Sequence, residues 1–304
     1  MRLRVVLALA CASVPLGARA TNGRLALSVL AGGGYASDVF VGAGVGQDAF
    51  VQVTPAARLD LSLAPAWKLG AAADASYGRY LASEVTSLVE TAALEGRWLP
   101  DPLFDVTLTA GAEHGSYALG SPLDPGSAAS PSVTSTVAGS ASSLLRLRSL
   151  GLEWRAAGVV ATRSSTSAGV DVSELDRAVL AGAMFPVGAH GSLSVTYKLA
   201  RNDSARPDFA LTAHAVFALV SWRLEALDLQ AQAQVQLQTG RLGTGTREEL
   251  ARVTLGVSYA LADALDTELT YSFAGAETTD PLRPSASRHL AFLGLRWRAA
   301  ELAW

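Results

Sequence analysis

The segment His114-Gly115-Ser116 holds residue types from which a hydrolytic site can be built. A neighbouring imidazole can take the proton of a hydroxyl, and the hydroxyl oxygen then becomes a nucleophile. If the segment is a β-strand, His114 and Ser116 share one face and Glu113 lies on the other, because successive side chains alternate across a strand. The spacing therefore supports an imidazole–hydroxyl pair without Glu113.

The remaining chemistry-bearing residues form no recognisable site. His190, His214 and His289 lie on separate segments, and none has a partner at metal-ligand spacing. The single cysteine, Cys11, lies in the N-terminal segment, so disulfides and cysteine nucleophiles are not expected in the rest of the chain. Glycine-rich runs at 31–34 and 41–46 lack the Lys-Ser/Thr ending of a phosphate loop. We expect no metal and no cofactor, and a net charge of −3 argues against nucleic-acid binding.

Polar side chains alternate with apolar ones over 229–239, which reads LQAQAQVQLQT. In a strand, the five glutamines lie on one face and the leucine, alanine and valine side chains on the other, whereas a helix would scatter them. A half-exposed strand of a soluble sheet shows the same pattern over a shorter run. The alternation recurs over 58–63, 104–109, 193–198, 252–259 and 265–273, so it belongs to the whole chain.

The connections between these segments alternate in length. Long polar links are expected around 36–48, 118–131, 164–173, 201–208, 240–249 and 275–287, with a shorter one at 81–85. Tight turns are expected near 64–66, 99–102, 149–150, 186–191, 225–228 and 260–264. This layout predicts an all-β fold, a transmembrane antiparallel up-and-down β-barrel of about fourteen strands. Closure is required because hydrocarbon offers no hydrogen-bond partner to an open sheet edge.

Parity along the strands predicts which side chains line the lumen. The expected set is Arg58, Asp60, Lys68, Asp74, Asp105, Glu113, Glu153, Arg155, Lys198, Gln230, Gln232, Gln234, Gln236, Gln238, Arg252, Asp266, Glu268 and Arg296, together with His214. Both signs of charge are present in similar number, so no ring of one sign predicts ion selectivity. The set suits a water-filled pore for neutral polar solutes or sugars, and equally a lumen closed by ion pairs.

Aromatic residues gather near the ends of the expected strands. The girdle on the short-turn side comprises Trp67, Trp98, Trp154, Trp222 and Trp297, and that on the loop side Tyr35, Tyr77, Tyr80, Tyr117 and Tyr197. Two belts of amphipathic rings at the lipid headgroups are typical of membrane barrels. Ordinary core aromatics are the alternative, but they would not sort to strand ends.

The N-terminus is expected to be a signal peptide at 1–20, followed by the barrel domain at 21–304. Arg2 and Arg4 precede an apolar run at 5–12, and Ala18-Arg19-Ala20 has the form of a cleavage site.

With these features the chain resembles the bacterial outer-membrane β-barrel (porin-like) superfamily. The segment 289–298, HLAFLGLRWR, is similar to the terminal strand with which such proteins address the barrel-assembly machinery, although 299–304 extends past it. The segment 34–38, GYASD, resembles a signature of porins linked with exopolysaccharide export, with Ala36 in place of an expected Asp. The first expected strand begins near Leu25, which leaves no room for the N-terminal plug that fatty-acid transporters of this superfamily carry.

The His114/Ser116 pair resembles the His-x-Ser arrangement of lipid A deacylases, which are smaller barrels. We expect His114 to be a girdle histidine instead. The function that the sequence favours is a passive channel or export conduit for small polar or saccharide molecules. A structural or surface-interaction barrel with a closed lumen and a lipid-modifying enzyme remain alternatives. The expected partners are outer-membrane lipid, the barrel-assembly machinery and a small solute.

Overall fold

The period-2 segments are strands in the computed structural model of the chain, which describes residues 22–37, 47–82, 86–101, 103–117, 132–147, 152–167, 170–204, 211–240, 247–279, 286–299 and 301–303. The expected signal peptide at 1–20 lies outside the described residues. The long strands are β1 (Asn22–Ser37), β2 (Gln47–Ala64), β3 (Trp67–Tyr80), β4 (Thr86–Asp101), β5 (Phe104–Tyr117), β6 (Ser132–Leu147), β7 (Leu152–Ser167), β8 (Val170–Val187), β9 (Gly191–Ser204), β10 (Leu211–Leu224), β11 (Leu227–Gly240), β12 (Arg247–Ala262), β13 (Leu265–Thr278) and β14 (Ala286–Arg298). In the described part of the chain, no helix is long and apolar enough to cross a membrane.

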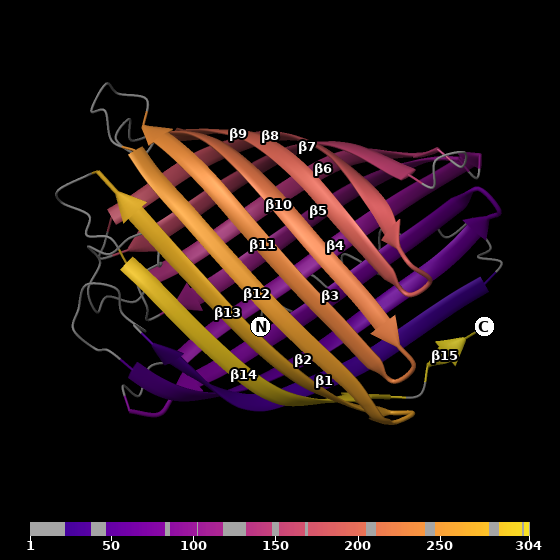
Figure 1. Cartoon of the computed structure of the whole chain (residues 1–304), viewed down its shortest axis with the longest axis horizontal. Helices are drawn as coiled ribbons and strands as arrows, with labels where there is room; N and C mark the ends of the chain where they lie inside the picture. The colour runs from indigo at the N-terminus through magenta and orange to yellow at the C-terminus, as the bar shows by residue number, and fades with distance from the viewer. Residues whose placement is uncertain are drawn as a thin grey trace.

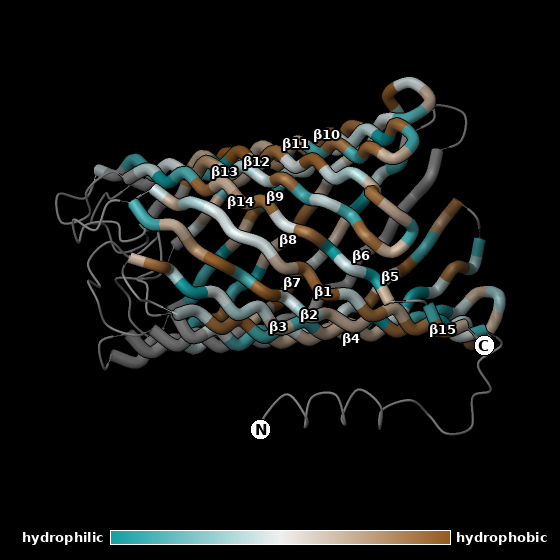
Figure 2. The backbone as a smooth tube through the Cα atoms, turned by 90° about the horizontal axis from the view of Figure 1, so that it is seen from below, coloured by the Kyte–Doolittle hydropathy of each residue, from teal (hydrophilic) through white to brown (hydrophobic). Residues whose placement is uncertain are grey.

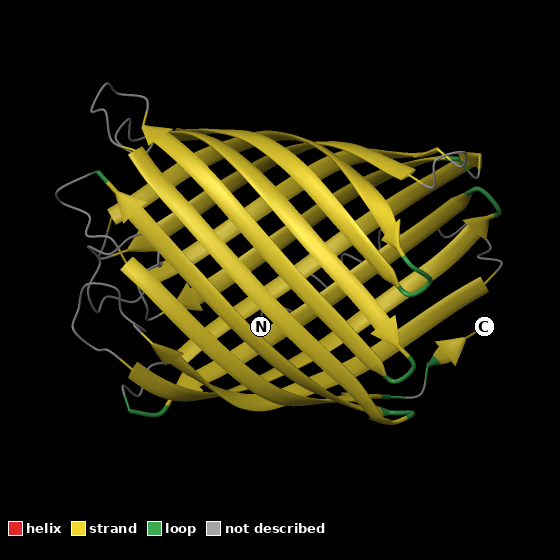
Figure 3. Cartoon of the chain, in the orientation of Figure 1, coloured by secondary structure: helices red, strands yellow, loops and turns green. Residues whose placement is uncertain are grey.

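Each strand pairs antiparallel with its neighbours in the chain, so the sheet has up-and-down topology (Figures 1 and 3). The sheet closes because β1 pairs with β14 as well as with β2, in a register that runs from Ser28↔Arg298 to Ala36↔Leu290. Closure gives the outermost strands partners on both sides, which is what a sheet in hydrocarbon requires. The prediction of an antiparallel barrel of about fourteen strands is confirmed.

The two faces of the sheet are told apart by contacts that skip a strand. The ring of Phe50 on β2 stacks 6.2 Å from that of Phe292 on β14, with β1 between them. Arg288 on β14 donates from Nη2 to the hydroxyl of Tyr80 on β3 at 3.1 Å, across both β1 and β2. Side chains of non-neighbouring strands can meet only on the concave side of a closed sheet. We call this face the inner face and the opposite one the outer face.

The outer face carries most of the large apolar side chains that are exposed. Val235 is 64% exposed, Val179 and Leu293 59%, and Leu108 58%, and the residues before and after them lie on the inner face. Figure 2 shows the resulting alternation of hydrophobic and hydrophilic residues along most strands. Such side chains on a closed sheet are what a lipid environment selects, because the apolar surface is then removed from water by lipid.

Short turns join the strands at one end of the barrel. They comprise 65–66, 188–190, 225–226 and 263–264, and Gly188 adopts a φ of 62° there, a conformation that glycine reaches without strain. The expected link at 164–173 is wrong: β7 continues to Ser167 and β8 begins at Val170. Serine- and threonine-rich sequence indicates a loop by composition, yet it also forms strands that continue beyond an apolar band.

The C-terminal segment continues the wall after β14. The two-residue strand β15 (Leu302–Ala303) pairs with β1 as Arg24↔Ala303 and Leu25↔Leu302, one residue out of register with the β1–β14 pairing. A single extra residue is a β-bulge, and it exchanges the faces of the residues that follow. The last strand is therefore longer than 289–298, and the bulge places Glu301 on the inner face and Leu302 on the outer.

Candidate functional site

The inner wall of the barrel is the candidate site. Strand register places the expected lumen residues on the inner face from β2 round to β14, including Arg58 opposite Ala72, Glu113 opposite Thr91 and Arg155 opposite Gly182. The same register holds for Asp60, Lys68, Asp74, Asp105, Glu153, Lys198, Gln230, Gln232, Gln234, Gln236, Arg252, Asp266, Glu268 and Arg296. Position 238 continues the series, and the side chain of Gln238 lies outside the described residues.

The inner face of β11 forms a glutamine ladder, Gln230 to Gln236. Gln230 and Gln232 are exposed, and Gln234 donates from Nε2 to Oε1 of Gln236 at 3.0 Å. The neighbouring strand presents Arg252 and Thr254 opposite Gln234 and Gln232. Exposed amides on a concave surface offer both donors and acceptors to water or to hydroxylated solutes.

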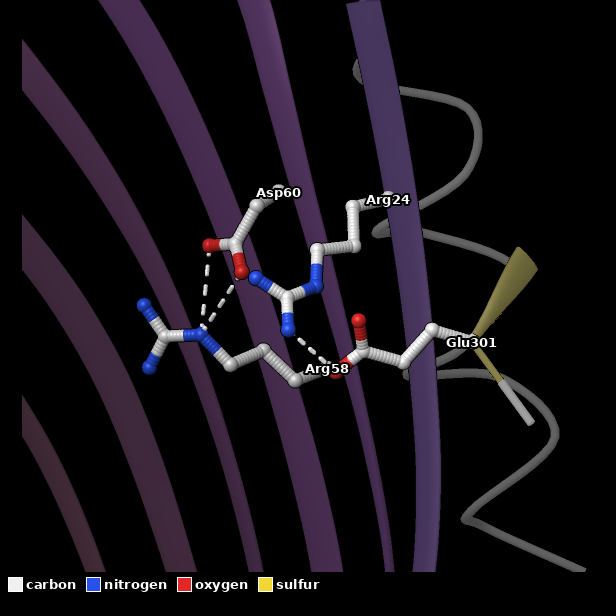
Figure 4. A network of polar contacts seen from close by, with 4 residues as sticks. All are labelled: Arg24, Arg58, Asp60 and Glu301. Atoms are coloured by element: carbon white, nitrogen blue, oxygen red, sulfur yellow. Dashed lines mark hydrogen bonds and ion pairs between the residues drawn. The ribbon is translucent and has the colours of Figure 1, made fainter. Parts of the chain in front are cut away.

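Ion pairs concentrate on the inner face near the short-turn end. The pairs are Arg24–Glu301, Arg58–Asp60 (3.0 Å), Arg97–Asp105 (2.5 Å), Arg223–Asp228 (2.9 Å), Arg296–Glu268 (2.6 Å) and Arg298–Asp266 (2.5 Å). Figure 4 shows Arg24 reaching Glu301 beside the Arg58–Asp60 pair, so that β1 is tied to the C-terminal segment next to an ion pair within β2. Arg24, Arg58, Asp60, Lys68 and Arg97 line a cavity of about 700 Å³.

One of these pairs is buried. The side chain of Asp105 is only 5% exposed and accepts from Nη2 of Arg97, which is 32% exposed. Nε of Arg97 is buried without a hydrogen-bond partner in the described structure. A buried carboxylate needs its cation, because an unpaired charge away from water is costly. This pair ties β4 to β5 close to the turn that joins them.

An aromatic cluster on the inner face was not expected from the sequence. Ala36, Phe50, Tyr80 and Phe292 are 0–8% exposed, and Leu30 and Leu290 pack against them. The rings of Phe50 and Tyr80 lie 5.4 Å apart, and Arg288 Nη2 donates to the Tyr80 hydroxyl. The cluster covers the loop-side half of the wall formed by β14, β1, β2 and β3, whereas the ion pairs lie near the short-turn end.

Glycines on the inner face make room for this cluster. A Cβ atom at Gly34 would meet the ring of Phe50, and one at Gly32 would meet the ring of Phe292, in both cases together with backbone atoms. A Cβ atom at Gly294 would meet the ring of Phe292 and the side chain of Leu30. The rings can therefore lie flat against the wall only where the side chains beneath them are missing. The sequence signal that could have indicated this cluster is the glycine-rich run at 31–34. Phe50 adds to this signal, because it lies two residues from Asp48 and from Gln52 and so shares their face.

The expected girdle residues differ in their placement. Trp67, Trp98, Trp154, Trp297, Tyr35, Tyr77 and Tyr197 lie on the outer face and are 40–52% exposed, while Trp222 packs more closely over Gly191. Tyr80 belongs to the inner cluster, so its assignment to the girdle is wrong, because register puts it on the face of Phe50. Tyr117 pairs with Ser87, and its side chain lies outside the described residues.

Two histidines, His214 and His289, lie next to tyrosine hydroxyl groups on the outer face. His214 lies on the outer face, where its Nδ1 is 2.6 Å from the Tyr197 hydroxyl, so its assignment to the lumen is wrong. The alternation on β10 places Ala213 and Ala215 inward instead, and both are buried. His289 repeats the arrangement with Tyr271 at 2.7 Å. Histidine–tyrosine pairs of this kind suit the polar boundary of an apolar band.

His114 also lies on the outer face. It pairs across strands with Glu90 on β4 and Ser135 on β6. Ser116 follows two residues later, and its side chain lies outside the described residues. The structure therefore adds a carboxylate, Glu90, opposite the imidazole, a neighbour that strand parity within β5 could not supply. Among the described residues, no group of three or more His, Cys, Asp or Glu side chains could hold a metal ion.

Known structures share this architecture. The chain is similar to OmpT, an outer-membrane protein of Vibrio cholerae folded in vitro, with 12% identity over 91% of this chain and 98% of that one and a TM-score of 0.55. A trimer form of in-vitro folded OmpT matches with 11% identity over 92% of this chain and 99% of that one, also at 0.55. OmpT expressed in the outer membrane matches at 0.53, with 13% identity over 91% and 97%.

No protein-family model matches the chain, and no curated protein matches it in sequence. At these identities the likeness to OmpT concerns the fold. That fold, with an apolar outer face and a polar inner face, defines the class of protein: a transmembrane antiparallel β-barrel. The function of this barrel has to be inferred from its inner wall.

Proposed function

We propose that the protein is a passive outer-membrane channel, or export conduit, for small polar or saccharide molecules. The observation that carries the proposal is the exposure of polar side chains on the concave face. Gln230, Gln232 and Arg252 are exposed although they point into a closed barrel, which a packed interior would not allow. Among the described residues, no large side chain is fully buried.

The size of the barrel supports an open lumen. Barrels of about eight strands are filled by their own side chains and barrels of about sixteen leave an aqueous channel, so fourteen strands lie near the open end of that range. Every described residue belongs to a strand of the wall, to the turns and bends that join these strands or to the C-terminal bulge. Among the described residues, the lumen is thus lined by wall side chains alone.

The chemistry of the lining supports uncharged polar solutes. Many inner charges are matched within the wall, as in Arg58–Asp60 and Arg296–Glu268, so neither sign dominates the field. The glutamine amides can exchange hydrogen bonds with water or sugar hydroxyls at little net cost. We further propose that the terminal strand, β14 with β15, is the part of the chain that the barrel-assembly machinery recognises.

Conductance of the protein refolded without residues 1–20 tests this proposal. In a planar lipid bilayer we expect steady open steps, and in liposomes we expect swelling with small sugars that stops above a limiting size. Gln232→Trp should lower both, because the indole enters the lumen. Ala233→Trp is the matched control: it adds the same side chain to the outer face of the same strand. A silent bilayer and no swelling would instead support a closed structural barrel.

A second candidate is a lipid-modifying site at His114 and Ser116. It is favoured by the cross-strand position of Glu90 opposite His114 on the outer face, where a lipid acyl chain would be the substrate. A carboxylate beside an imidazole can orient it as a base for a hydroxyl nucleophile. If this site is active, His114→Ala will alter the lipid profile of the expressing cells; an unchanged profile removes the candidate.

A further inference from the structure

Two arginines lie directly opposite each other on the outer face of the barrel. Arg177 on β8 pairs in register with Arg201 on β9, and their side chains are 59% and 63% exposed. The same row continues to Val160 on β7 and Thr212 on β10. Like charges directly opposite across a sheet are destabilising, so this pair calls for a compensating group.

The position of the pair along the strand places it at the edge of the apolar band. Below Arg201, the outer face of β9 carries Leu199, Tyr197, Val195 and Leu193. Eight residues of strand span about 26 Å, which is about 20 Å along the membrane normal at a tilt of about 40°. The guanidinium groups therefore lie where hydrocarbon gives way to lipid headgroups, at the end of the barrel opposite the short turns.

Among the described side chains, the charge of this site is only partly matched. Asp203 accepts from Arg201 Nε at 3.2 Å, and its other oxygen lies 4.0 Å from Arg177 Nη1. It is the only acidic residue among the described side chains on the outer face of β7 to β10. One carboxylate between two guanidinium groups leaves a net positive charge, and charge next to hydrocarbon is costly unless it is paired.

A shallow groove of about 470 Å³ runs beneath the two arginines. Its apolar side chains are Val160, Val179 and Leu199, and Arg177, Arg201 and Thr212 form its polar edge. Gly158 deepens it, since a Cβ atom at that position would meet nothing within 4 Å. A groove with an apolar floor and a cationic upper edge has the shape and polarity of a bound lipid: an acyl chain below and an anionic headgroup above.

We propose that Arg177 and Arg201 bind the phosphate of a lipid headgroup, with one acyl chain of that lipid in the groove over Gly158. Two planar guanidinium groups present paired N–H donors in the fork geometry that phosphate oxygens accept. The negative charge of a phosphate balances the positive charge that Asp203 leaves unmatched. The site is independent of the lumen, so it holds whether or not the barrel conducts.

Native mass spectrometry of the folded barrel in detergent tests the site with three probes. Dioleoylphosphatidic acid carries the phosphate and the chains, dioleoylglycerol the chains alone, and inorganic phosphate the anion alone. We expect one retained phosphatidic acid per barrel, with weaker retention of the other two. Arg177→Gln with Arg201→Gln should weaken phosphatidic acid binding about tenfold, the loss that follows from removing charge-assisted bonds worth about 1.4 kcal/mol.

The acyl groove and the specificity of the charge are tested by two further variants. Gly158→Leu keeps both arginines and fills the groove, so phosphatidic acid binding should fall while inorganic phosphate binding is unchanged. Arg79→Gln removes an outer-face arginine on β3, away from the groove, and should leave binding as in the unmodified protein. The proposal is overturned if the double arginine variant retains phosphatidic acid as well as the unmodified protein does. It is also overturned if Arg79→Gln loses as much binding as the double arginine variant.

Discussion

Two stretches of the inner wall use polar residues in opposite ways. On β13, β14 and β1 to β5, inner side chains find partners in one another: ion pairs near the short turns and an aromatic cluster near the loops. On β11 and β12, the glutamine ladder and Arg252 remain open to the lumen. Paired groups hold the wall together, whereas exposed groups are available to a passing solute. The difference indicates that one stretch stabilises the barrel and the other defines its passage.

The largest expected effect comes from the aromatic cluster. Phe50→Ala removes a ring that is 6% exposed and leaves a gap beside Tyr80 and Phe292. Loss of a buried phenylalanine costs about 3 kcal/mol, which we expect to see as a lower unfolding midpoint in urea, in detergent or lipid vesicles. Phe217→Ala, on the partly exposed inner face of β10, is the control and should cost much less. Equal losses would contradict the division between the two stretches.

The buried ion pair should give the next largest effect. Arg97→Gln removes the guanidinium that pairs with the buried carboxylate of Asp105, at a cost of about 2 kcal/mol. Adding Asp105→Asn to that variant removes the carboxylate charge as well and should restore part of the stability. The same urea titration checks both. A single variant as stable as the parent would show that the charge of Asp105 does not depend on Arg97.

A charge added to the glutamine ladder should change selectivity rather than stability. Gln232→Lys places a cation in the lumen. Its interaction with an ion about 4 Å away in water is worth about 1 kcal/mol. The reversal potential under a salt gradient should move toward anion preference, while the unfolding midpoint stays near that of the parent. An unchanged reversal potential would mean that ions do not pass β11.

The exposed Arg24–Glu301 pair should matter least. Both side chains are about half exposed, and surface ion pairs are screened by water and salt. Glu301→Gln should therefore leave the unfolding midpoint almost unchanged. A large drop would show instead that the bulge before β15 depends on this pair.

Alternation explains how much of this was predictable from the sequence. A period of two assigns the glutamines of β11 to one face, since one residue determines the orientation of all the others. The errors arise where residue type rather than alternation guides the assignment: Tyr80 is expected in a girdle because it is aromatic, and His214 in the lumen because it is polar. The aromatic cluster depends on the closure of β14 against β1, which is a non-local contact. Likewise, Glu90 faces His114 only through the register of β4 and β5.

Cysteine scanning of β11 in lipid tests the central account most directly, because Cys11 is the only cysteine of the chain and is absent from the protein refolded without residues 1–20. Single cysteines at 229–236 would be exposed to a charged, membrane-impermeant methanethiosulfonate reagent. We expect positions 230, 232, 234 and 236 to react and positions 229, 231, 233 and 235 to stay protected by lipid. Uniform reaction, or protection on both faces, would contradict a closed barrel with a water-filled interior.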